Sequence, residues 1–153
     1  MMLIIINRKD PKNHPPYTIK KYCGRGSALG NEFSHLQKTS HESVYVKDRD
    51  QACDLMRVQL LKYLLDSKNM FPKSKKIKEA FNEIYRLHIR GEVVALECYC
   101  KNRDDANSIN IGQRCHTEDI KYIIEKLEDE MKNGRGTKEN VSFVLSELLK
   151  EFS

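Results

Sequence analysis

The chain has 153 residues, which is the length of a single domain. Its 39% of hydrophobic residues suffices for one compact core, while its 32% of charged residues argues against a membrane protein. Composition and periodicity together argue against a coiled coil, a collagen-like chain or a wholly disordered chain. The net charge of +5 is spread along the sequence, which is typical of an ordinary surface, although it would also favour a polyanion or a nucleotide as partner.

The first apolar segment, residues 2–6, is expected to form a short buried strand. It is far shorter than the roughly 20 apolar residues that span a bilayer. An Asn-Arg-Lys-Asp-Pro segment follows it where a secretory signal would carry small residues for cleavage. We therefore expect a cytoplasmic protein without a membrane partner.

Residues 17–23 are expected to form a second strand that leads directly into a glycine-rich turn. This turn, Gly-Arg-Gly-Ser-Ala-Leu-Gly-Asn at residues 24–31, is called the glycine loop below. A turn of this composition can present backbone amides to an anion, with Arg25 as a bidentate donor beside them. Its spacing is neither that of the dinucleotide fingerprint nor that of a P-loop, so a purely structural turn remains the alternative.

Apolar residues recur at helical spacing in four further segments, at residues 49–67, 74–90, 117–132 and 137–152. Asp48 and Ser74 are expected to cap the first two helices. Between the second and third helices, the continuous apolar run at residues 93–96 is typical of a central strand covered on both faces. This order indicates an α/β protein with a small Rossmann-like sheet of about four strands flanked by helices. Residues 1–132 would form this domain, and residues 133–153 an extra C-terminal helix.

Five cysteines in a chain without an export signal are better explained as core residues, metal ligands or reactive groups than as a disulfide set. Cys98 and Cys100 would project from the same face of a strand end, and Cys115 and His116 would precede a helix whose N-terminus stabilises a thiolate. These four residues could bind Zn²⁺ as a Cys₃His site. Two alternatives remain: a metal-free site in which Cys100 or Cys115 works with His116, and coincidental buried thiols beside a capping histidine.

Three other residues of these types are expected to belong to the core. Cys53 lies inside a predicted helix, His88 lies on the apolar face of another, and Cys23 ends a predicted strand beside the glycine loop.

In this order, the motifs resemble those of domain-of-unknown-function family 4326, a bacterial and phage family, over about residues 17–128. The similarity lies in the Gly-Arg-x-Ser-x-x-Gly-Asn-x-Phe pattern at 24–33, Arg-x-x-Ala at 49–52, Ile-Arg-Gly at 89–91, Cys-x-Cys at 98–100 and Cys-His at 115–116. The chain departs from the family pattern at Glu32, where the family has Pro, at Tyr99, where it has Trp, and at Thr117-Glu118, where it has Gly-Asp.

The resemblance implies a compact α/β domain related to Rossmann-like nucleotide-binding proteins, with its ligand at the carboxyl ends of the strands. It implies that the glycine loop and the Cys/His segment share one cleft. The backbone of Gly24, Gly26, Ser27 and Gly30 would then hold a phosphate together with Arg25. The remaining ligand contacts would come from Asn31, which would orient a sugar or base, and from Arg49, which would add positive charge.

The function expected from these features is binding of a nucleotide or nucleobase derivative. Its candidate reaction is at the glycosidic bond or the base, with an acid, base or nucleophile drawn from Cys100, Cys115, His116 and Glu118. One alternative is a zinc-stabilised protein that binds nucleic acid or protein through the lysines at positions 73, 75, 76 and 78. Another is a phage protein that sequesters a host nucleotide signal.

Overall fold

The computed structural model of the chain describes residues 2–7, 17–34, 44–98, 101–102, 111–112 and 114–153. Its sheet has three parallel strands in the order β1 (Met2–Asn7), β5 (Val93–Cys98), β2 (Ile19–Tyr22). Two pairs of two-residue strands lie apart from it: β3 (Phe33–Ser34) with β4 (Val44–Tyr45), and β6 (Lys101–Asn102) with β7 (Ile111–Gly112).

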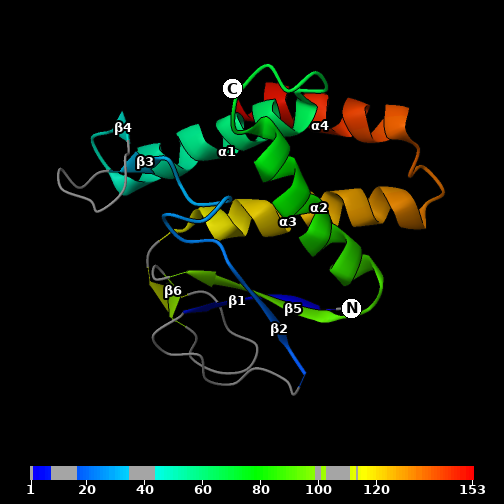
Figure 1. Cartoon of the computed structure of the whole chain (residues 1–153), viewed down its shortest axis with the longest axis horizontal. Coiled ribbons are helices and arrows are strands. Elements are labelled where there is room, and N and C mark those ends of the chain that lie inside the picture. Colours follow the sequence, from blue (N-terminus) through cyan, green and yellow to red (C-terminus); the bar gives the residue numbers. More distant parts are fainter. Residues whose placement is uncertain (1, 8–16, 35–43, 99–100, 103–110, 113) are drawn as a thin grey trace.

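All four helices lie on one side of this sheet (Figure 1). They are α1 (Arg49–Leu65), α2 (Ser74–Ile89), α3 (His116–Lys132) and α4 (Lys138–Phe152). α3 crosses directly over the sheet, and α1 and α4 form a further layer above it (Figure 1). The α/β class predicted from the sequence is confirmed, in an arrangement consistent with a small Rossmann-like fold and a three-stranded sheet.

The central strand β5 is buried on both faces, as its continuous apolar sequence predicts. Val94 and Leu96 join Leu3 and Ile5 in the main core beneath the helices. On the opposite face, Ala95 clusters with two buried isoleucines of β1, Ile4 and Ile6. This double burial explains why β1 and β5 lack the alternation of polar and apolar residues seen in half-exposed strands.

The C-terminal helix shares the main core with the rest of the chain. Leu145 and Leu148 of α4 are buried in the same cluster as the sheet and the other helices. Phe152 packs at its edge and lies beneath the guanidinium of Arg57 on α1, 4.2 Å from the ring centre.

One capping expectation is wrong. Ser74 does not cap α2; Lys73 is the N-cap residue, and the Ser74 hydroxyl donates instead to Asp66 at 2.6 Å. By contrast, Asp48 caps α1 as expected and accepts a hydrogen bond from the Gln51 amide.

No helix within the described residues is both long and apolar enough to cross a membrane.

Candidate functional site

The glycine loop folds into two consecutive tight turns after β2. The Gly24 carbonyl accepts from both the amide and the hydroxyl of Ser27, at 3.1 and 2.6 Å, and the Gly30 amide donates to Ser27 at 3.1 Å. Gly26 has a φ of +87°, which side-chain-bearing residues rarely adopt. A Cβ atom on Gly30 would lie 2.4 Å from the Gly24 carbonyl oxygen, so glycine is required there to close the loop.

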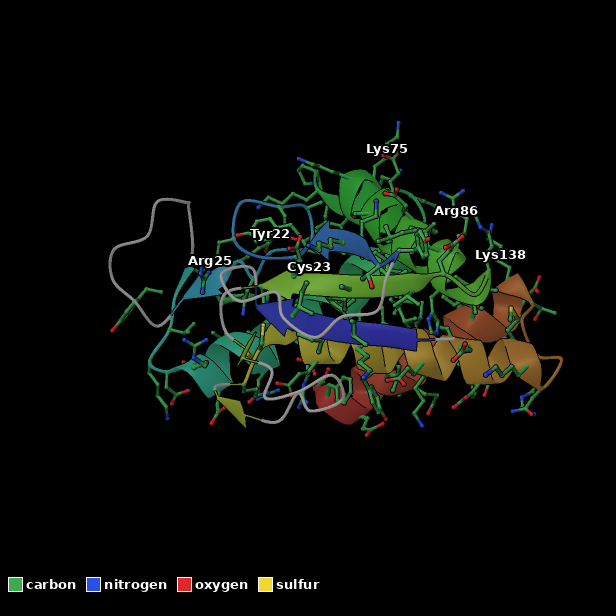
Figure 2. The ribbon with its side chains drawn as sticks, turned by 90° about the horizontal axis from the view of Figure 1, so that it is seen from below. Tyr22, Cys23, Arg25, Lys75, Arg86 and Lys138 are labelled. Atoms are coloured by element: carbon green, nitrogen blue, oxygen red, sulfur yellow. The ribbon has the colours of Figure 1, made fainter. Side chains whose placement is uncertain are left out.

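Arg25 closes the loop through its own side chain. Its two terminal guanidinium nitrogens donate to the carbonyls of Asn31 and Phe33, each at 2.8 Å, and its carbonyl accepts from the Tyr22 hydroxyl at 3.2 Å. Figure 2 shows Tyr22, Cys23 and Arg25 together at the carboxyl end of β2. Arg25, which was predicted to bind an anion, therefore also holds the second half of the loop in place.

Asn31 fastens the loop to helix α1. Its side-chain nitrogen donates to the Ala52 carbonyl at 3.3 Å, and its side-chain oxygen accepts from the Phe33 amide at 2.9 Å. Because Asn31 is 91% buried, these bonds are shielded from competing water.

A cavity of about 370 Å³ lies between the glycine loop and the start of α2. Its volume is in the range of small-molecule sites. Its wall comes from the glycine loop, from Glu32 directly after it, and from the N-cap and first turn of α2; the lining residues are Arg25, Gly26, Ser27, Ala28, Gly30, Asn31, Glu32, Lys73, Lys76 and Ile77. Of the predicted ligand-binding residues, Gly24 and Arg49 do not line this cavity.

Several polar groups on the cavity wall are available to a ligand. Within the described part of the chain, the amides of Gly26 and Ala28 have no hydrogen-bond partner, and Lys76 has no ion pair. Lys73 lies 3.2 Å from the Glu32 carboxylate. Amides and ammonium groups on one wall are suited to a negatively charged ligand.

Glu32 is held at the cavity by a buried tyrosine. The Tyr63 hydroxyl of α1 lies 2.8 and 3.0 Å from the two carboxylate oxygens of Glu32, to which it donates. Burial, together with this hydrogen bond and the Glu32 charge, raises the pKa of Tyr63 well above its usual value, so the hydroxyl keeps its proton. From the sequence, Glu32 is recognisable only as a departure from the family pattern, and no local signal indicates Tyr63 as its partner.

The Cys/His segment, Cys115 and His116, forms the start of α3 and contacts the end of β2. Cys115 is the N-cap residue, and its amide donates to the Glu118 carboxylate at 3.3 Å. The His116 ring lies with Nε2 2.5 Å from the Cys23 carbonyl oxygen and Nδ1 3.6 Å from the Cys115 sulfur. The structure therefore places His116 in contact with Cys23, the residue that directly precedes the glycine loop.

The thiols of this region are deeply buried. Cys23, Cys98 and Cys115 are each at most 1% exposed, and the Cys98 sulfur lies 3.9 Å from the Thr117 hydroxyl. Burial, with smaller contributions from Cys98 and Glu97, raises the pKa of Cys23 to about 12. Cys53 and His88 are likewise buried, as expected for core residues.

No group of three or more metal-ligating side chains stands together among the described residues, and Cys100 lies outside them. Zinc therefore stays a prediction that depends on Cys100. Zinc at one equivalent per chain, lost on Cys98→Ser, would confirm it.

Asp119 is a buried acid that the sequence analysis missed. Its side chain is 14% exposed, and its Oδ2 atom lies 3.9 Å from Arg114 and has no hydrogen bond from a described residue. Burial raises the pKa of Asp119 to about 6, against the opposing effect of Arg114 and Arg57. On a helix surface an Asp beside a Glu is usually exposed, so only the tertiary packing of α3 on α1 could identify it.

Comparison with known proteins gives one match. The profile of the family described as Domain of unknown function (DUF4326) matches residues 6–126. This range includes the glycine loop, the cavity lysines and the start of α3, and the chain belongs to that family. No curated protein and no solved structure matches the chain.

Proposed function

We propose that this member of the DUF4326 family binds a nucleotide, or a nucleobase derivative that carries a phosphate, in the cavity beside the glycine loop. One observation carries the proposal: the cavity wall combines loop amides that bond no described residue with the ammonium groups of Lys73 and Lys76. Such a wall stabilises a phosphate by charge-assisted hydrogen bonds.

The position of the cavity in the fold supports the same ligand class. The glycine loop follows the carboxyl end of β2, at the edge of the sheet where the parallel strands end. Helix α2 begins near the same edge, because it leads back to the start of the parallel strand β5. Ligands of open α/β sheets bind beyond this edge. The first turn of α2 has no side-chain cap, so its positive dipole end also favours an anion there.

The residues divide into two roles in this proposal. Lys76 and the amides of Gly26 and Ala28 contact the phosphate, while Arg25 and Asn31 hold the loop in shape and Arg25 adds its charge to the wall. The described candidates for catalysis, Cys115, His116 and Glu118, do not line the cavity. The proposal is therefore one of binding, and a reaction at these residues stays a prediction.

Two neighbouring lysines of α2 allow a matched test. Lys76 lines the cavity, whereas Lys75 is exposed, lies outside the cavity wall and projects away from the protein (Figure 2). In calorimetric titrations with adenosine monophosphate, we expect Lys76→Ala to weaken binding by roughly tenfold, since it removes a charge-assisted hydrogen bond. Lys75→Ala removes the same charge from the same helix and should leave the affinity nearly unchanged.

Two outcomes would contradict the proposal. Unaltered affinity in Lys76→Ala would show that the cavity is not the site. If both variants lost affinity equally, and if the affinity of the unaltered protein fell as salt was raised, the ligand would be attracted to the exposed surface of α2. Such behaviour is expected of a face that binds nucleic acid.

A further inference from the structure

One acid on the cavity wall bears on the kind of phosphate that the cavity accepts. Glu32 contributes a carboxylate to a wall that otherwise carries only the cations Arg25, Lys73 and Lys76. With three positive charges and one negative charge, the wall has a net charge of +2. A phosphomonoester carries a charge of about −2 at neutral pH, because its second ionisation lies near pH 6.

Glu32 is fixed in this position. Its side chain is 23% exposed and is held from two sides, by the Tyr63 hydroxyl at 2.8 Å and by Lys73 at 3.2 Å. Tyr63 is itself buried in α1, at 6% exposed, so a movement of Glu32 would break a hydrogen bond that is shielded from water. The carboxylate also partly neutralises Lys73, which leaves Lys76 as the wall's unpaired ammonium group within the described residues.

A carboxylate fixed beside a phosphate site has two effects on a ligand. It repels each further phosphoryl group, which adds about one more negative charge. It also accepts hydrogen bonds from donors such as sugar hydroxyls, because an ionised carboxylate has about four acceptor positions and Tyr63 and Lys73 occupy three of them.

From this arrangement we propose that the cavity selects nucleoside monophosphates over di- and triphosphates, and that Glu32 is the residue that determines this selectivity. The inference rests on the proposed function, because it concerns the same cavity. The expected ligand is a phosphomonoester that carries hydroxyl donors close to its phosphate. Glu32 acts on the ligand directly, by repulsion and hydrogen bonding.

Titration of the full chain with adenosine mono-, di- and triphosphate tests this inference. We expect the monophosphate to bind the unaltered protein more tightly than the triphosphate by roughly tenfold, since two extra charges meet Glu32 at short range. In Glu32→Gln, which retains an oxygen acceptor for Tyr63, this preference should largely disappear. Glu79→Gln, an exposed α2 residue outside the cavity wall, changes the net charge equally and should preserve the preference.

The outcomes separate this inference from the proposed function. If all three nucleotides bind with equal affinity and Lys76→Ala weakens each of them, the cavity is a nucleotide site but the selectivity is wrong. A preference that survives unchanged in Glu32→Gln would show that another residue sets it. If none of the three binds, the proposed function falls and this inference falls with it. The titrations of the unaltered protein decide on the selectivity even if Glu32→Gln does not fold.

Discussion

Arg25 shows how one side chain can serve both the loop and the site. Both terminal nitrogens of its guanidinium are bonded to backbone carbonyls, yet the residue lines the cavity and adds positive charge to it. An Arg25→Ala variant would lose affinity for two reasons at once, a loosened loop and a lost positive charge, and the measurement would not separate them. Lys76, which has no structural partner among the described residues, is the residue whose removal reports on binding alone.

The Cys23 thiol should be almost unreactive in the folded protein. With a pKa of about 12 and no exposed surface, it exists almost wholly as the thiol at pH 8, whereas alkylation requires the thiolate. In native protein treated with iodoacetamide and analysed by peptide mass spectrometry, we expect Cys23 to stay unmodified. The same treatment in denaturant should modify it fully. Rapid labelling of Cys23 under native conditions would show that this end of β2 opens to solvent.

Asp119 should make stability depend on pH between about 4 and 6. Its folded pKa of about 6 lies above the unfolded value of about 3.9, so the folded state binds the proton more tightly. Its contribution to stability is therefore complete below pH 4 and is lost as pH rises through 6. Asp119→Asn removes this dependence. From pH 4 to pH 7, we expect the variant to gain on the order of 2 kcal/mol relative to the unaltered protein.

Urea titrations at several pH values measure this difference. A constant difference between the two proteins over this range would show that Asp119 is not buried as a carboxyl group. Asp129→Asn on the same helix, where Asp129 is exposed, is the matched control and should show no such trend.

Some single residues of the site are predictable from sequence and others are not. Cys53 and Cys23 are correctly assigned to the core, at 2% and 0% exposed, as is usual for free cysteines. Glu32 and Tyr63 meet across 31 positions of sequence, and the partners of Arg25 are backbone carbonyls, which no residue pattern encodes. The type of side chain at the cavity was thus predictable in part, but its bonding partners were not.

At the scale of elements, periodicity predicts the helices because each helix buries one face. The continuous run at 93–96 correctly indicates the central strand, since only a strand buried on both faces needs no polar residues. The capping residue of α2 was predicted wrongly because the Ser74 hydroxyl bonds Asp66, eight positions earlier, in place of its own helix amides. Local capping rules do not anticipate such a tertiary partner.

The glycine loop should not tolerate a side chain at Gly30. A Cβ there would meet the Gly24 carbonyl oxygen at 2.4 Å, and this backbone atom cannot move without breaking the turn. We expect Gly30→Ala to lower the free energy of unfolding by about 1–3 kcal/mol. At Gly136 a Cβ would approach the Met131 side chain at 3.3 Å, and that flexible chain can shift. In urea titrations, Gly136→Ala should therefore change the free energy of unfolding by less than about 1 kcal/mol. Equal effects in the two variants would contradict the tight geometry of the loop.

At the scale of the whole molecule, the family match ends at residue 126 but the core does not. α4 lies outside the match and packs along α1, the helix to which Asn31 fastens the glycine loop. The described core is continuous from β1 to α4, and the helix beyond the matched region stabilises the element that carries the loop.

We therefore expect α4 to unfold together with the rest of the chain. Leu148→Ala removes a buried side chain from the shared core and should lower the free energy of unfolding by about 2–5 kcal/mol. Phe143→Ala, which removes a larger side chain that is 61% exposed on the same helix, should change it by less than about 0.5 kcal/mol. Urea unfolding followed by circular dichroism measures both values. If α4 were an independent appendage, Leu148→Ala would produce a separate early transition and leave the main transition at its original midpoint. A single transition shifted to lower urea would show that one core spans the chain and that loss of packing in α4 destabilises the glycine loop through α1.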